Sequence, residues 1–364
     1  MELDSKKIFK TLNPNKVWIP IIIGLGIVIY QIYTDEDYTT DKLNLIFEAK
    51  AIFVILAIIV LLARDVGYVY RIRSLTNKEL SWNSCIYTII LWEFASAVTP
   101  SVVGGTAVAV FILYKEGINI GKSLAYVMLT AILDNLFFVV AAPLVIILTK
   151  GDIFPAIEGV EIRLGSTLQY LFGVSYLLIA LYTFIMSYAL FIRPRAFKWV
   201  LLKITSVRFL RRWRQGAYLH GNEIIAASAQ LKGKSIRYWS RIVLSTIFIW
   251  CSRYFMLNCL IAAFAGVNIA DQMVIFARQV ILWIIMLVSP TPGSSGFSEY
   301  FFKQFFEGYL DGYTLSSQIL WRGLTYYTYL LLGAIFLPRW IKRVFFKKKT
   351  DKVQGTQEDE AQGS

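Results

Sequence analysis

Long apolar blocks separated by short polar loops dominate this chain. A helix needs about 20 consecutive apolar residues to cross the hydrocarbon core of a bilayer. Six blocks reach or approach that length, and they cover residues 17–33, 45–63, 123–148, 168–192, 242–265 and 316–337. The pattern predicts an all-α multi-span membrane protein with about six transmembrane helices.

Two further apolar blocks are shorter than a span. Residues 85–98 and 276–289 each cover 14 positions, which is about 21 Å of helix. Each block runs into a Thr-Pro followed by glycine and other small residues, and then into a second short apolar stretch. Proline lacks an amide donor and glycine relaxes the backbone, so neither block continues as a straight helix. Each region is either a kinked crossing or a re-entrant helical hairpin, over 85–114 and 276–306.

Loop charge separates these two interpretations. The loop over 193–241 carries twelve Lys and Arg residues, and the positive-inside rule places such a loop in the cytoplasm. A full crossing by 85–114 would put it outside, counting from a cytoplasmic N-terminus. A re-entrant 85–114 places the basic segments 1–16, 64–83, 193–241 and 339–352 together in the cytoplasm. The hairpin over 276–306 then enters from the outer face.

The expected organisation is an inverted repeat. A basic N-terminus (1–16) precedes a first membrane half (17–192), and a second half (242–338) precedes a basic, then disordered, tail (339–364). The linker over 193–241 interleaves aromatic and basic residues, which predicts an amphipathic helix on the inner leaflet. Inverted repeats with interrupted apolar segments are typical of transporters that bind substrate near the bilayer midplane.

Composition narrows the function classes. Of all residues, 57% are hydrophobic and 17% are charged, against about 45–50% and about 25% in soluble domains. The net charge of +13 lies beside apolar blocks, which favours contacts with phospholipid headgroups over nucleic acid. Three cysteines in apolar segments argue against a disulfide framework. The sequence contains no Walker loop, H-E-x-x-H or G-x-S-x-G motif, so we expect no cofactor and no metal.

Charged residues inside the apolar segments are the candidates for chemistry. They are Glu93, Asp134, Arg253, Arg278, Glu299 and Arg322. Each would cost roughly 2.5–3.5 kcal/mol at the bilayer centre, so they are expected to pair or to line a wet cavity. Arg278 and Glu299 are placed to meet across the second hairpin. Asp134 with Asn135 is either a proton or cation site or a cap for the first hairpin. Structural ion pairs that lock the hairpins are the alternative for all six.

The two breaks carry motifs of a known family. The first reads Phe-Ala-Ser-Ala-Val-Thr-Pro over 94–100 and Gly104-Gly105, then Leu-Tyr-Lys-Glu-Gly over 113–117. The second reads Thr-Pro-Gly-Ser-Ser-Gly-Phe-Ser-Glu over 291–299. Over roughly 45–340 the chain resembles the lysylphosphatidylglycerol synthase transmembrane region, whose members are also described as flippase-like. Ser294 stands where the Pro-Gly-Gly-x-Gly-x-x-Glu signature has its second glycine.

The resemblance implies translocation or handling of a lipid, and we predict a translocator that moves a polar, anionic or zwitterionic lipid headgroup through a groove near the midplane. The chain ends shortly after the last predicted span, so we expect the separate synthase domain of bifunctional members to be absent. The expected location is the bacterial cytoplasmic membrane, with both termini cytoplasmic and phospholipids as partners; association into a homo-oligomer is left open. Two rivals are an intramembrane lipid-modifying enzyme, with Glu299 and Asp134 as acid and base, and a scaffold that binds partners through 193–241.

The candidate substrate site combines the intramembrane charges with both breaks. Amides at the start of a half-helix favour an anion such as a phosphate. The residues expected to form the site are Glu93, Thr99, Pro100, Gly104, Gly105, Asp134, Asn135, Arg253, Asn258, Arg278, Thr291, Pro292, Gly293, Ser294, Ser295, Gly296, Glu299 and Arg322.

Overall fold

The computed structural model describes residues 40–99, 102–151, 153–155, 164–287, 291 and 294–346. Throughout these ranges the regular secondary structure is helical. The predicted span over 17–33 lies outside the described residues, as do Pro100, Pro292 and Gly293.

Five segments of the described chain are long and apolar enough to cross a membrane. They are α3 (Ala51–Leu75), α6 (Ile120–Leu148), the segment Leu168–Ile192, α10 (Ile236–Phe264) and α11 (Ile269–Met286). The segment Leu168–Ile192 consists of most of α7 (Leu164–Ser187) and a π-helical turn (Tyr188–Ile192). Four of the five correspond to predicted spans, so the protein is an all-α multi-span membrane protein.

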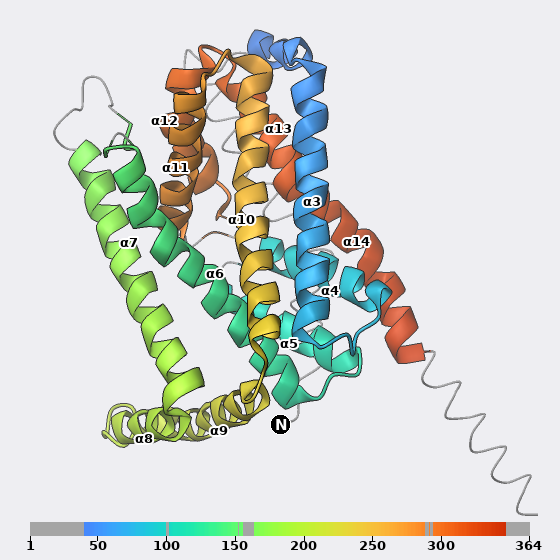
Figure 1. Cartoon of the computed structure of the whole chain (residues 1–364), viewed down its shortest axis with the longest axis vertical. Helices are drawn as coiled ribbons and strands as arrows, with labels where there is room; N and C mark the ends of the chain where they lie inside the picture. The colour runs from blue at the N-terminus through green and yellow to red at the C-terminus, as the bar shows by residue number, and fades with distance from the viewer. Residues whose placement is uncertain are drawn as a thin grey trace, which may run out of the picture.

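The last predicted span, over 316–337, lies within one continuous helical stretch that contains a π-helical turn. This stretch consists of α13 (Thr314–Arg322), the π-helical turn (Gly323–Tyr327) and α14 (Thr328–Ile341). Together they descend along one side of the molecule in Figure 1. Single π-helical turns inside α-helices frequently occur at functional sites.

Helix α3 is longer at its C-terminal end than the sequence predicted. The prediction of 45–63 stopped before Arg64 and assigned 64–83 to a cytoplasmic loop, but the helix continues to Leu75. Its inner face packs against α10 so closely that a Cβ on Gly67 would lie 2.9 Å from Ile249 Cγ1. The prediction was wrong because Arg64 and Arg71 are buried in this packing, only 0% and 3% exposed, rather than solvated in a loop.

Two helical hairpins lie in opposite halves of the molecule. In the first, α4 (Trp82–Val98) packs on α5 (Val102–Lys115), and a Cβ on Gly105 would lie 2.4 Å from Ser96 Oγ. In the second, α11 packs on α12 (Phe297–Leu310), and Arg278 Nη1 donates to the Phe305 carbonyl at 2.7 Å. Figure 1 shows α4 and α5 in the lower half and α11 and α12 in the upper half. The second hairpin begins at Ile269 rather than 276, because Asn268 and Asp271 form a capping box there.

The segment after α7 lies across the lower end of the bundle. It contains α8 (Pro194–Ile204), a short 3₁₀ helix (Arg211–Trp213) and α9 (Arg214–Leu231) (Figure 1). Helix α8 packs on α9, where Lys198 covers Gly221 and Lys198 Nζ donates to Asn222 Oδ1 at 2.7 Å. Helix α8 buries none of its residues and exposes Trp199 and Ile204. The linker is therefore helical, but as two helices joined by turns and a short 3₁₀ helix, and its placement as an amphipathic segment on the inner leaflet stays a prediction.

The opposite end is closed by a 3₁₀ helix over Thr40–Glu48. Tyr313 Oη, just before α13, donates to Glu48 Oε2 at 2.7 Å. This hydrogen bond and the carboxylate charge raise the pKa of the Tyr313 phenol, which therefore stays a neutral donor.

An aromatic core joins the middle of the bundle. The rings of Phe138 on α6 and Trp283 on α11 stack with centroids 3.6 Å apart, and Trp250 on α10 meets Phe138 edge-on at 4.5 Å. Buried aromatic pairs of this kind contribute about 0.5–1.5 kcal/mol each beyond their buried area. The core therefore fixes α6, α10 and the first limb of the second hairpin relative to one another.

Candidate functional site

Two adjoining cavities lie between the hairpins and the long helices. The hairpin cavity, of about 520 Å³, is lined by the facing ends of both hairpins, by α10, and by the helical stretch α13–α14. The side cavity, of about 570 Å³, is lined mainly by α3, α4, α6, α7 and α10. Both cavities are lined by Glu93, Ser96, Arg253, Trp283 and Leu287. The two spaces therefore meet at an acidic and a basic side chain.

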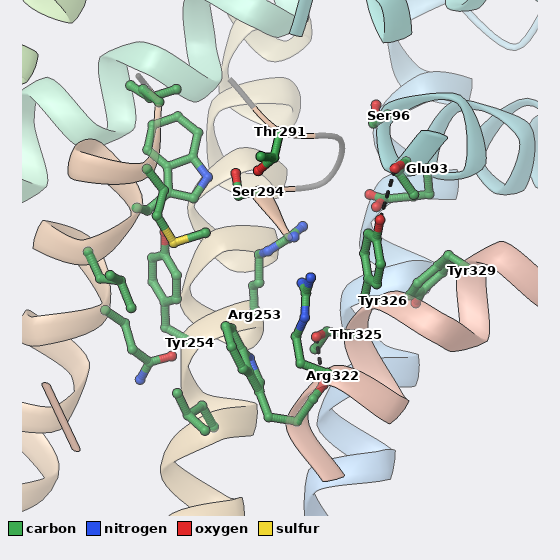
Figure 2. Close-up of a pocket in the computed structure, with 18 of the residues that line it drawn as sticks. Glu93, Ser96, Arg253, Tyr254, Thr291, Ser294, Arg322, Thr325, Tyr326 and Tyr329 are labelled. Carbon is green, nitrogen blue, oxygen red and sulfur yellow. Dashed lines mark hydrogen bonds between the residues drawn. The ribbon is translucent and has the colours of Figure 1, made fainter. Parts of the chain in front are cut away.

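Glu93 and Arg253 are both half-buried and carry opposite charges. Within the described parts of the chain neither makes an ion pair or a side-chain hydrogen bond; the Arg253 guanidinium lies 5.4 Å over the Trp250 ring. Figure 2 shows Arg253 and Arg322 directed toward the loop that carries Thr291 and Ser294. The sequence predicted Glu93, Arg253 and Arg322 as site residues, and the fold brings all three to one cavity.

Polar hydroxyls and aromatic rings complete the hairpin cavity. The predicted residues Thr99, Thr291 and Ser294 line it. Sequence reasoning missed further lining residues, which are Ser96, Tyr254, Gln279, Trp283, Thr325, Tyr326 and Tyr329. Uncharged residues of this kind are common in helices, so no local sequence signal separates them from ordinary packing residues.

Tyr326 connects the two hairpins through its hydroxyl. Tyr326 Oη donates to the Ala97 carbonyl at the end of α4, at 3.0 Å. It accepts from Ser295 Oγ in the second break, at 3.3 Å. One side chain from the π-helical turn therefore contacts both breaks.

Glu299 forms a buried ion pair in the second hairpin. It is 1% exposed, and its Oε1 lies 2.7 Å from Arg322 Nε. Its Oε2 accepts from the Gly296 amide at 2.6 Å and from Ser298 Oγ at 2.8 Å. Arg322 also donates to Ser295 Oγ at 3.2 Å. Glu299 therefore caps α12 and attaches the second hairpin to α13, and it does not line either described cavity.

The expected contact between Arg278 and Glu299 is not formed. Arg278 instead donates to the Phe305 carbonyl, and its guanidinium lies 5.1 Å over the Tyr309 ring. The prediction was wrong because Arg322, at the end of the next helix α13, occupies the position next to Glu299. The presence of opposite charges on the two limbs of one hairpin was therefore not enough to predict which arginine pairs with Glu299.

The second break contains two residues with positive φ. Gly296 has φ of 91° and Ser294 has φ of 54°. Ser294 is the position at which the signature has glycine, and a left-handed conformation costs a non-glycine residue about 1–3 kcal/mol. The serine therefore keeps the turn that the signature requires, under strain, and places its side chain on the hairpin cavity.

Asp134 and Arg71 form an ion pair on the side cavity. Arg71 Nη1 and Nη2 lie 2.5 and 3.2 Å from the two Asp134 carboxylate oxygens. Trp250 Nε1 donates to Asp134 Oδ1 at 2.9 Å, and Arg71 also donates to Thr246 Oγ1. Asn135 lines the same cavity. Asp134 therefore lies in the predicted region, but with a cation that the sequence analysis assigned to a loop.

A second cluster that the sequence analysis missed lies beside the hairpin cavity. Arg64 Nη2 donates to Asp65 Oδ1 at 2.7 Å and to Tyr329 Oη at 2.6 Å, while Tyr329 Oη donates to Asp65 Oδ2 at 2.5 Å. Arg64, Tyr68 and Arg71 lie three and four positions apart in the sequence. That spacing places them on one helix face and was the signal that could have extended the predicted span.

The remaining predicted residues lie elsewhere or have no described side chain. Asn258 is buried between α10 and α11, where its amide donates to Gln272 Oε1 at 2.6 Å and its carbonyl accepts from Gln279. Gly105 and Ser295 support the hairpins rather than line a cavity. Gly104 lies in the first turn of α5. In the described ranges no group of three His, Cys, Asp or Glu side chains could hold a metal.

Comparison with known proteins agrees with the motifs in the two breaks. Residues 17–333 match the family model described as the lysylphosphatidylglycerol synthase TM region. The chain is also similar to a UPF0104 membrane protein of Archaeoglobus fulgidus, with 25% identity over 340 residues, covering 88% of this chain and 94% of that protein. Because the family match extends over most of the chain, this multi-span membrane protein belongs to the family of the lysylphosphatidylglycerol synthase transmembrane region.

Proposed function

We propose that this protein moves a phospholipid between the two leaflets, with the headgroup passing through the hairpin cavity. One observation carries the proposal: two hairpins from opposite halves of the bundle end at a common cavity that contains Arg253 without an ion-pair partner. A guanidinium binds phosphate strongly through paired hydrogen bonds. An unpaired charge inside a membrane domain is a mark of a substrate pathway.

The surrounding charges support a role for Arg253 in binding. Arg322, Arg71 and Arg64 each lie against a carboxylate within 2.7 Å. Their charges are therefore compensated by the protein itself. Arg253 has no such partner among the described residues, so its charge is available to a ligand.

The arrangement of the hairpins supports transport rather than one-sided binding. Described residues at both breaks, Thr99 in the first and Thr291 and Ser294 in the second, line the same cavity, and the hairpins reach it from opposite halves of the bundle (Figure 1). We propose that both hairpins are re-entrant. We also propose that the end bearing α8 and α9 is cytoplasmic, because the basic loop over 193–241 lies there.

If protons drive transport, we propose that Glu93 is the residue that carries the proton. Asp134, the other candidate, accepts hydrogen bonds from Arg71 and Trp250 and is held in an ion pair. Protonation of Asp134 would leave Arg71 buried without its counter-charge, which is costly. Glu93 has no such partner within the described residues, so its protonation breaks no ion pair.

The enzyme alternative has less support. It needs Glu299 and Asp134 to act together, but each is held by a different arginine and only Asp134 lines a cavity. The scaffold alternative has no specific support beyond the exposed face of α8.

A reconstituted transport assay tests the proposal. The protein is placed in liposomes that contain phospholipids fluorescently labelled on an acyl chain, and a membrane-impermeant reductant bleaches the outer leaflet. Arg253→Gln is expected to slow label exchange by roughly tenfold or more, the loss of a charge-assisted contact. Arg208→Gln, in an exposed loop, is the matched control and should exchange at the wild-type rate.

Mass spectrometry of the same liposomes separates transport from chemistry. Translocation predicts an unchanged lipid composition. No exchange above empty liposomes, or a new lipid product, would contradict the proposal.

A further inference from the structure

We infer that the lipid carried by this site has a zwitterionic headgroup, whose phosphate contacts Arg253 and whose amine contacts Glu93. The inference rests on the proposed function and names the substrate class of the same site. It starts from a single juxtaposition: a cation and an anion, neither with an ion-pair partner among the described residues, line the same two cavities.

Glu93 and Arg253 attract each other through space without forming a contact ion pair. An ion pair would bring a guanidinium nitrogen within 4.0 Å of a carboxylate oxygen, and Glu93 and Arg253 do not form one. Two separated charges on a cavity wall, with no contacting counter-charge among the described residues, are costly in low-dielectric surroundings. A ligand that carries a negative and a positive group would compensate both at once.

Ligands with a single charge sign fit less well. An acidic headgroup on Arg253 would leave Glu93 uncompensated and would be repelled by it. A purely cationic group on Glu93 would leave Arg253 without a contacting counter-charge and would be repelled by it. The other carboxylates around the two cavities, Asp65, Asp134 and Glu299, lie in direct contact with arginines. Glu93 acts on Arg64 only through space, so among the described residues it is the carboxylate with oxygens open to an amine.

Aromatic rings around the hairpin cavity favour an ammonium group. Tyr254, Trp283, Tyr326 and Tyr329 all line it. The faces of such rings attract cations. One face of Tyr326 is covered by Arg322, one face of Tyr329 by Arg64 and one face of Trp283 by Phe138, so only the remaining faces are open to a ligand. The amine is therefore expected at Glu93, with the phosphate toward Arg253.

The side cavity offers a path for the acyl chains. Its lining includes Leu178, Ile179 and Tyr182 of α7. Leu178 and Tyr182 are also 53% and 48% exposed, so the cavity wall is shared with the outer surface of the bundle. The headgroup can occupy the junction at Glu93 and Arg253 while the chains extend past α7 toward lipid.

The test compares two lipids in the same transport assay. Acyl-labelled phosphatidylethanolamine carries a phosphate and an amine, and acyl-labelled phosphatidylglycerol carries the phosphate alone. Wild-type protein is expected to exchange phosphatidylethanolamine faster, and Glu93→Gln is expected to reduce that preference by roughly tenfold, the effect of losing one charge-assisted hydrogen bond. Glu79→Gln, at an exposed carboxylate paired with Lys122, is the matched control.

The outcomes distinguish the two proposals. Equal exchange of both lipids, unchanged by Glu93→Gln, overturns the zwitterion inference and leaves translocation intact. No exchange of either lipid contradicts translocation itself. A third arm supplies water-soluble glycerophosphoethanolamine outside the liposomes. If the protein takes this solute up faster than it exchanges either lipid, the ligand with a phosphate and an amine is a free solute. That result would overturn the lipid inference.

Discussion

The two hairpins differ in how they treat an intramembrane carboxylate. Glu299, at the start of α12, is 1% exposed and binds Arg322, the Gly296 amide and Ser298. Glu93, late in α4, lies on two cavities without a described partner. Both residues are glutamates close to a Thr-Pro break. The difference teaches that a charge inside a membrane domain can be fixed by direct contacts, as Glu299 is, or can face a cavity, as Glu93 does, and only the second kind is a candidate for binding.

The largest expected effect tests the paired carboxylate. Glu299→Gln removes the counter-charge of Arg322 and weakens the cap of α12. Loss of one partner from a buried ion pair costs about 3–5 kcal/mol. The free energy of unfolding, measured by denaturant titration in detergent micelles, should fall by that amount.

Glu93→Gln is the counterpart of this variant in the first hairpin. No described ion pair is lost, so its unfolding free energy should stay within about 0.5 kcal/mol of wild type. If the two variants are equally destabilised, the contrast between the hairpins is removed and Glu93 is a structural residue.

The next prediction concerns the contact that holds the first hairpin against α14, and we expect an intermediate loss of stability. Gly333 on α14 contacts the buried ring of Phe94 on α4, and a Cβ there would lie 2.2 Å from Phe94 Cγ. Gly333→Ala should therefore destabilise the protein by about 1–3 kcal/mol, the usual cost of overpacking. Thermal unfolding followed by tryptophan fluorescence measures the change.

Gly323→Ala is the control for that prediction. Nothing lies within 4 Å of a Cβ at Gly323, so its unfolding temperature should equal or exceed that of wild type. A Gly333→Ala protein as stable as wild type would mean that α14 does not hold the first hairpin at Phe94.

The smallest effect tests the connection between the hairpins. Tyr326→Phe deletes the hydroxyl that joins the Ala97 carbonyl to Ser295. A hydrogen bond of this kind contributes about 0.5–1.5 kcal/mol, and the unfolding free energy should fall by that amount. Tyr327→Phe, one residue later, has no described hydroxyl hydrogen bond and should show no loss. Equal values for both variants would show that the two breaks are not coupled through Tyr326.

Much of the fold follows from one-dimensional pattern. Apolar block length predicted the helices α3, α6, α7 and α10, because a bilayer requires a minimum length of apolar helix. The Thr-Pro breaks predicted where helices stop, because proline and glycine act on the local backbone. The end of α3 was missed because contacts with other helices bury its arginines: Arg71 pairs with Asp134 on α6, and Arg64, paired with the neighbouring Asp65, also donates to Tyr329 on α14.

The candidate site follows from sequence only in part. The residue types were visible: charges inside apolar blocks are rare, so Glu93, Asp134, Arg253 and Arg322 stood out. Their pairing was not visible. Arg278 and Glu299 share one hairpin, yet Glu299 binds Arg322, which lies 23 positions away in sequence.

Sequence alone therefore determined the membrane class, the helical segments, the two breaks and the set of charges that require compensation. It did so because hydrophobic length and backbone chemistry are properties of a local stretch of chain. Only the tertiary structure decided which charges have a contacting counter-charge among the described residues and which do not. Compensation depends on contacts of a few ångströms between helices such as α3 and α6, or α12 and α13, and those contacts form only when the bundle packs.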